Sequence, residues 1–102
     1  MSLKNKLELA RIKMIRYRIL KVLDVGRPYP VGDGLLVDVL VDADLNVTQH
    51  ETRRALQYLC DKGYVDIKDH GSHWEARLLP KGVDYIEISH TEDDGIARPV
   101  EI

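Results

Sequence analysis

The chain has little that would cross-link it or carry it into a membrane. Its 102 residues include one cysteine, one tryptophan and no phenylalanine. A single cysteine excludes an intramolecular disulfide and is typical of proteins from a reducing compartment. No apolar run approaches the roughly 20 residues that a membrane-spanning helix needs. Residues 1–20 also lack the apolar core and cleavage site of a secretory signal. The sequence therefore predicts a cytoplasmic protein with no membrane partner.

Motifs for catalysis, cofactor binding and metal binding are missing as well. There is no glycine-rich phosphate loop, no His-Glu-x-x-His pair and no nucleophile elbow. The residues beside Cys60 offer no positive charge that would activate its thiol. The residues of metal-binding type have a spacing that fits no structural zinc finger; they are Cys60, Asp69, His70 and His73. We expect no catalytic residue, no metal and no cofactor, and hence no enzyme.

The charge of the chain is unevenly distributed along its length. Residues 1–23 carry seven basic side chains and one acidic side chain, a net charge of +6, whereas residues 24–47 carry a net −4. Residues 48–82 come to +1 and residues 83–102 to −5, within an overall charge of −2. The overall value therefore hides a strongly basic first segment and an acidic tail.

Residues 4–24 are expected to form one long helix, because no glycine or proline interrupts them. One apolar stripe at helical spacing is expected to pack on the core; it comprises Leu9, Ile12, Ile15, Ile19, Val22 and Leu23. A second stripe lies almost opposite the first; it comprises Leu3, Leu7, Ala10, Met14 and Tyr17. A domain of this size has no spare layer to cover the second stripe. The sequence therefore predicts that its five residues form a homodimer interface.

A loop and a second helix follow. Residues 26–34 contain two prolines and three glycines, which indicates a loop. We expect a helix over residues 34–45 with Asp33 as its N-cap, although its β-branched content leaves a strand as an alternative. The inward face of the helix would consist of Leu36, Val37, Leu40 and Val41. Its outward face would consist of Asp38, Asp42 and Asp44.

The clearest local signals lie in "TQHETRRALQYLCDKGYVDI", residues 48–67. Thr48 and Glu51 form the capping-box pattern that begins a helix, and Gly63 suits the left-handed residue that ends one. The expected helix 48–62 would bury Thr52, Ala55, Leu56 and Leu59. Two alternating segments around "HGS" predict a β-hairpin, and Pro80 suits the first position of a short closing helix. We divide the chain into a domain over residues 1–90 and an acidic, mobile tail over residues 91–102.

This order of parts resembles a winged helix-turn-helix domain. Residues 48–88 are similar to the core of MarR-like and PadR-like regulators, in which residues 48–67 match the recognition helix and the following strand. "RLLPKGVDYIE" is similar to the turn that closes their wing, with Leu79 and Pro80 in place of the usual Leu-Thr. The chain as a whole resembles small winged-helix proteins of Mu-like prophages. The resemblance implies an α+β, mainly helical fold with a long N-terminal helix, a C-terminal β-hairpin wing and a short closing helix.

The resemblance also implies sequence-specific binding of double-stranded DNA by a small bacterial or phage transcriptional regulator, with helix 48–62 in the major groove. Arginine can donate two hydrogen bonds to guanine, and glutamine can pair with adenine in the same way. The expected DNA-binding residues are Gln49, His50, Arg53, Arg54 and Gln57 on the helix, with Lys68 on the wing. Contact from the wing is expected to be weak, because Lys68 is the only reliably charged basic residue at its tip and Asp69 opposes it.

The acidic second helix argues against DNA binding, because like charges near phosphate weaken it. Basic residues of the first helix would offset this effect if they lie on the DNA side; they are Lys13, Arg16, Arg18 and Lys21. Winged helices also serve as protein–protein modules. The alternative function is therefore an adaptor that binds another protein and no DNA.

Overall fold

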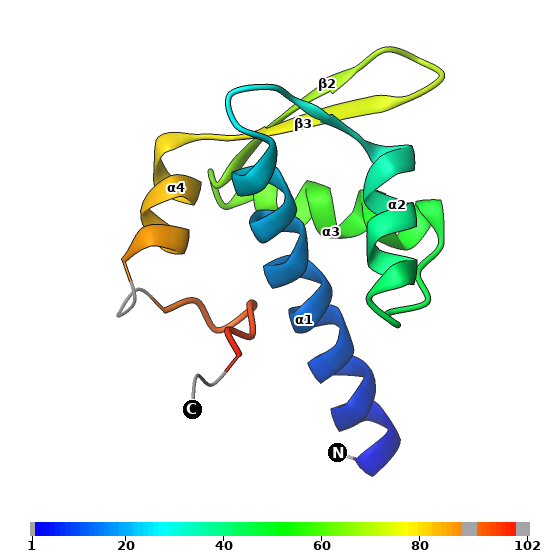
Figure 1. Cartoon of the computed structure of the whole chain (residues 1–102). Helices are drawn as coiled ribbons and strands as arrows, with labels where there is room; N and C mark the ends of the chain where they lie inside the picture. Colours follow the sequence, from blue (N-terminus) through cyan, green and yellow to red (C-terminus); the bar gives the residue numbers. More distant parts are fainter. Residues whose placement is uncertain (1, 89–91, 100–102) are drawn as a thin grey trace.

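The computed structural model describes residues 2–88 and 92–99. Helix α1 crosses the molecule, with α2 and α4 on either side of it and α3 behind it, while a β-sheet covers one end (Figure 1). The elements are α1 (Leu3–Gly26), β1 (Val31–Gly32), α2 (Asp33–Asp42), α3 (Gln49–Asp61), β2 (Val65–Asp69), β3 (Trp74–Leu78) and α4 (Pro80–Glu87). The fold is α+β, with four helices and three antiparallel strands in the described residues. This layout is compatible with the one that the sequence predicts.

The predicted boundaries of α3 are confirmed by its capping groups. The Thr48 hydroxyl accepts from the Glu51 amide at 3.1 Å, and the Glu51 carboxylate accepts from the Thr48 amide at 3.3 Å. These two bonds satisfy amides at the helix start that have no partner within the helix. At the other end, Gly63 has a φ of 83°, the left-handed conformation that closes a helix. Pro80 is the first residue of α4, as predicted.

Helix α2 departs from the prediction at both ends and on its inner face. Gly32 is its N-cap, and Asp33 is instead its first residue and only 1% exposed. The helix ends at Asp42, because the chain turns away through Asp44 with a φ of 62°. Leu36 and Leu40 are buried as predicted, but Val41 is 45% exposed, because at 100° per residue it lies well to the side of the face that these two leucines define.

The sheet has the strand order β1-β3-β2, so β3 pairs on both sides. Ala76 of β3 lies opposite Val31 of β1 and Ile67 of β2. The predicted β2–β3 hairpin is confirmed, and Gly71 in its turn has a φ of 86°. Strand β1 lies within the predicted loop, where a segment of two residues is too short to show an alternating pattern.

The core lies where α1 meets the other helices and the sheet. The residues with at most 1% exposure include Ile19, Leu20, Leu23, Leu36, Leu40, Leu56, Leu59, Val65, Ala76 and Tyr85. The N-terminal half of α1 projects beyond this body (Figure 1), so that Leu9 is 40% exposed although its stripe was predicted to pack inward. Among the described residues, no helix combines the length and apolarity that crossing a bilayer demands.

Residues 92–99 pack on the domain, which corrects the prediction of a separate mobile tail for this part of residues 91–102. Ile96 is 6% exposed and belongs to the core. The hydroxyl groups of Tyr58 and Tyr64 donate to the Asp93 carboxylate at 3.0 and 2.7 Å. Burial would raise the pKa of Asp93, but hydrogen bonds led by that from Tyr64 outweigh it and lower the pKa. Polar contacts of this kind leave no periodic signal in the sequence. Residues 91 and 100–102 lie outside the described residues.

Candidate nucleic-acid interface

The outward side of α3 carries most of the residues predicted to contact DNA. Gln49, His50, Arg54 and Gln57 are exposed. The four residues that were predicted to be buried on the opposite side are all at most 5% exposed. At 100° per residue, His50 points most directly away from the core, Gln57 and Arg54 lie on either side of it, and Arg53 lies further round towards the core. The predicted division of the helix into two faces is therefore confirmed for these residues.

Arg53 differs from its neighbours, because it is half-buried and paired with an acidic residue. Its Nε donates to Asp33 Oδ2 at 2.7 Å, and its side chain is 26% exposed. The guanidinium carbon also lies 5.0 Å from the centre of the Trp74 ring. Arg53 was predicted to be an exposed residue that contacts bases. The structure shows instead that this side chain is half-buried and that it links α3 to α2 and β3.

The Asp33 carboxylate is the centre of this arrangement. Besides the bond from Arg53, Oδ2 accepts from Gln49 Nε2 at 3.2 Å, and Oδ1 accepts from the Trp74 amide at 3.1 Å. Burial would raise the pKa of Asp33, but the bonds from Arg53, Trp74 and Gln49 outweigh it and lower the pKa. The carboxylate is therefore ionised at neutral pH and links α2, α3 and β3. Because these residues lie 16 to 41 positions from Asp33, sequence patterns did not reveal the cluster.

The hydrogen bonds on the outward side of α3 leave part of the Arg53 guanidinium available to other partners. Arg53 uses only Nε, and its two terminal nitrogens make no hydrogen bond with residues 2–88 or 92–99. Gln57 Nε2 donates to Asp61 Oδ1 at 2.9 Å, one turn further along the helix. Asp61 thus places an acidic group at the C-terminal end of the same surface. This surface therefore offers a partner both hydrogen-bond donors, on Arg53, and an acceptor, on Asp61.

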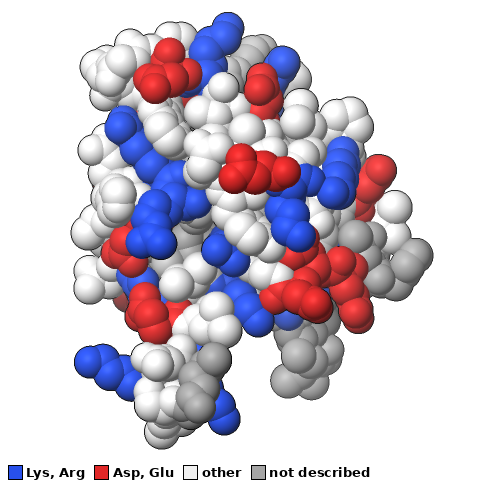
Figure 2. Space-filling view, turned by 180° about the vertical axis from the view of Figure 1, so that it is seen from behind, with Lys and Arg blue, Asp and Glu red and all other residues white. Residues whose placement is uncertain are grey.

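The surrounding surface is not uniformly basic. Figure 2 shows the face opposite to that in Figure 1, where basic and acidic side chains are interspersed and form no continuous positive area. On the hairpin, Lys68 is exposed but lies opposite Glu75, and Arg77 Nε lies 3.8 Å from Asp66 Oδ2. The net electrostatic attraction of the hairpin for phosphate is consequently weak.

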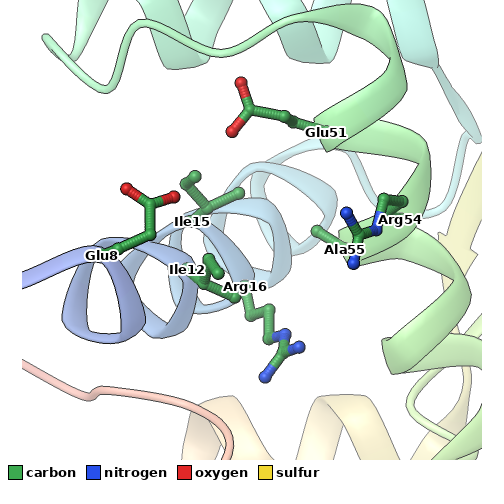
Figure 3. A pocket seen from close by; sticks show the side chains of 7 residues that line it. All are labelled: Glu8, Ile12, Ile15, Arg16, Glu51, Arg54 and Ala55. Atoms are coloured by element: carbon green, nitrogen blue, oxygen red, sulfur yellow. The ribbon is translucent and has the colours of Figure 1, made fainter. Parts of the chain in front are cut away.

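A cleft of about 190 Å³ lies between α1 and α3. Its lining consists of Glu8, Ile12, Ile15, Arg16, Glu51, Arg54 and Ala55 (Figure 3). Arg11 Nη1 binds Glu51 Oε2 at 2.7 Å, while Arg16 lies 3.6 Å from the Tyr58 ring centre and donates to the Gly95 carbonyl at 2.9 Å. The cleft is smaller than the range of about 300–1,000 Å³ that is common for ligand pockets. Internal contacts already use two of its charged groups, so we assign no ligand to it.

The predicted homodimer stripe lies mostly on the projecting part of α1. Leu3, Leu7 and Met14 are 74%, 65% and 50% exposed, and Ala10 is exposed as well. Tyr17 differs, because it is half-buried against the core and the guanidinium carbon of Arg98 lies 6.0 Å from its ring centre. The apolar surface available to a partner therefore centres on the first four residues of the stripe.

Comparison with known proteins identifies no relative of the chain. No family model matches it, and neither the curated proteins nor the solved structures contain a significant match. The function is therefore inferred from the side chains described above and from their arrangement.

Proposed function

We propose that the protein is a winged-helix DNA-binding protein, a small bacterial or phage regulator of transcription. In this proposal α3 enters the major groove and the β2–β3 hairpin is the wing. The order of the elements supports it, since a capped and exposed helix is followed directly by a hairpin. The observation that carries the proposal is the outward side of α3, where Arg53 is oriented by a buried carboxylate beside exposed Arg54 and Gln57.

The orientation of Arg53 matters because of the shape of its guanidinium group. With Nε bound to Asp33, the two terminal nitrogens remain as a pair of donors. Such a pair matches O6 and N7 of guanine in the major groove. An arginine that is already held by a carboxylate and an aromatic ring loses less side-chain freedom when it binds. The Asp33 pair therefore prepares Arg53 for base recognition while it stabilises the fold.

The second part of the proposal is a homodimer formed through α1. Leu3, Leu7 and Met14 form an exposed apolar surface on the projecting part of the helix. Two identical helices can pack on each other about a two-fold axis, as an isologous interface requires. A dimer would present two α3 helices to half-sites about 34 Å apart along DNA. It would also double the number of phosphate contacts.

The test is fluorescence anisotropy with a library of DNA duplexes at low salt, followed by a salt titration on the duplex that binds best. Arg54→Ala and Gln57→Ala should each weaken specific binding by about 1–3 kcal/mol, because each removes donors to base edges. Both side chains are exposed, so folding should be unaffected. Lys6→Ala removes an exposed positive charge from the projecting end of α1 and is the control. Equal binding by the wild type and by both α3 variants would refute the proposal.

The charge distribution favours a second candidate, an adaptor that binds another protein. Asp38, Asp42 and Asp44 are exposed on or beside α2, where they would repel phosphate. The same aspartates would attract a basic protein surface. The salt titration separates the two candidates, because affinity for DNA falls steeply with salt through counterion release. Failure to bind any duplex at low salt, together with capture of a partner that needs these aspartates, would favour the adaptor.

A further inference from the structure

The tip of the β2–β3 hairpin brings together three side chains of metal-binding type. His70 follows β2, His73 precedes β3, and Glu75 belongs to β3. The His70 amide donates to the His73 carbonyl at 2.9 Å, and Gly71 supplies the left-handed turn between them. The two imidazole rings consequently stack, with their centres 4.7 Å apart and their planes at 18°. The hairpin backbone thus determines how these side chains are placed.

The distances within this cluster approach those of a metal site. Glu75 Oε2 lies 3.4 Å from His70 Nε2, and Glu75 Oε1 lies 3.8 Å from His73 Nε2. A zinc ion with bonds of about 2.0–2.1 Å separates tetrahedral ligands by roughly 3.3–3.4 Å. One ligand atom from each side chain can be chosen so that all lie within 4.8 Å of one another. Both histidines are exposed, so rotation of their side chains can shorten the distances between the ligand atoms to those that zinc requires.

We propose that the hairpin tip binds a divalent transition-metal ion, of which zinc is the best match. Nε2 of His70 and of His73 and one carboxylate oxygen of Glu75 would be its ligands, with water in the remaining position. Imidazole nitrogens favour zinc, nickel and copper, whereas magnesium and calcium favour sites made of oxygen atoms alone. The spacing of these residues in the sequence matches no structural zinc finger, because Glu75 is only two positions beyond His73. The site is formed across a turn, with one ligand contributed by β3.

A neighbouring hydroxyl group supports this assignment. Ser72 Oγ lies 3.1 Å from His73 Nδ1, the ring nitrogen that is not proposed as a ligand. When this hydroxyl accepts from Nδ1–H, the lone pair of His73 is on Nε2 and is available to the metal. Histidines that bind metals commonly have a hydrogen-bond partner of this kind on the other ring nitrogen. The interaction also limits rotation of the ring.

A bound ion would change the charge of the tip. With neutral histidines, the tip carries one basic side chain, Lys68, and two acidic ones, Asp69 and Glu75, so its net charge is −1. An ion of charge +2 would bring this net charge to +1. The tip would then attract an anionic partner, which its own side chains do not. The metal site itself does not depend on the proposed DNA-binding function, and it can be tested without DNA.

The experiment is a titration of the full chain with Zn²⁺ at neutral pH by calorimetry, and with Co²⁺ by visible absorption. We expect one ion per chain, and we expect His73→Gln and Glu75→Gln each to weaken binding about 10-fold or more. His50→Gln is the matched control, since it removes an exposed histidine from α3, outside the cluster. Mg²⁺ should not compete with Zn²⁺.

A second measurement keeps the proposal testable if a hairpin variant is unstable. In the wild type, Zn²⁺ should shift the imidazole NMR signals of His70 and His73 together, and leave those of His50 unchanged. The proposal is overturned if the wild type binds no Zn²⁺ at micromolar concentrations. It is equally overturned if both hairpin variants bind as tightly as the wild type, or if the signals of these two histidines do not move.

Discussion

Replacing Arg53 with alanine should destabilise the fold, although Arg53 lies on the outward side of α3. Its guanidinium is the only cationic partner of Asp33 among the described residues, and Asp33 is 1% exposed. The substitution leaves a buried carboxylate without a compensating charge. On the pattern of the sequence alone, the same substitution would affect only an exposed side chain. The free energy of unfolding therefore distinguishes the structural role of Arg53 from a role in binding alone.

The magnitude follows from the contacts that remain. A hydrogen bond to a charged group contributes about 1.5–3 kcal/mol, and removal of one partner from a buried ion pair costs about 3–5 kcal/mol. The Trp74 amide and Gln49 continue to donate to Asp33 in the variant. The Arg53 side chain is also 26% exposed, which weakens the pair through solvent screening. We therefore expect Arg53→Ala to lower the free energy of unfolding by about 3 kcal/mol, the upper end of the first range and the lower end of the second.

The loss of stability in Arg53→Ala should become smaller as the pH falls. In the wild type the pKa of Asp33 is lowered, so its contribution to stability is complete above the unfolded-state value of about 3.9 and is lost as the pH falls through the lower folded value. Without Arg53, the effect of burial is less opposed and the pKa of Asp33 rises. Protonation of the variant then relieves its uncompensated charge. The difference in stability between the two proteins should narrow as the pH falls from 7 towards about 3.

Urea unfolding, followed by the fluorescence of the single tryptophan and by circular dichroism, measures this difference at each pH. Arg54→Ala is the matched control, because it removes an exposed arginine at the next position of the helix. Its effect should stay within about 0.5 kcal/mol. A loss of stability in Arg53→Ala no larger than that in this control would refute the structural role of Arg53. A difference from wild type that is the same at pH 7 and pH 3 would refute the part played by the Asp33 charge.

Three further predictions concern packing and assembly. Leu59→Ala should lower the free energy of unfolding by about 2–5 kcal/mol, because Leu59 is fully buried; an unchanged urea midpoint would contradict this. Gly82→Ala should destabilise by about 1–3 kcal/mol in the same assay, because its Cβ would lie 2.2 Å from the Tyr64 carbonyl oxygen; a stability equal to wild type would show that this contact is relaxed. Light scattering should find a dimer that the double substitution Leu7→Asp, Met14→Asp converts to a monomer, since both side chains are exposed on the predicted interface. A wild type that is monomeric at tens of micromolar, or a variant that remains dimeric, would exclude this interface.

The sequence by itself determined the parts of the fold that depend on neighbouring residues. The capping box at Thr48, the left-handed Gly63 and the spacing of the buried residues of α3 all act within a few positions of one another. Alternation in the two hairpin strands and the position of Pro80 are local signals of the same kind. Such features constrain the backbone wherever the segment lies, so they can be read before the tertiary structure is known.

Only the tertiary structure decided the roles of residues whose partners are distant in the chain. Asp33 has the sequence signature of an N-cap, but it became a buried acceptor because α3 and β3 place three donors around it. Residues 92–99 have no apolar periodicity, and they dock because Tyr58 and Tyr64 present hydroxyl groups to Asp93. His70 and Glu75 come together because strand pairing brings the two sides of the turn into contact. In each case the groups that meet belong to segments separated in the chain, and the order of residues does not specify which of them will meet.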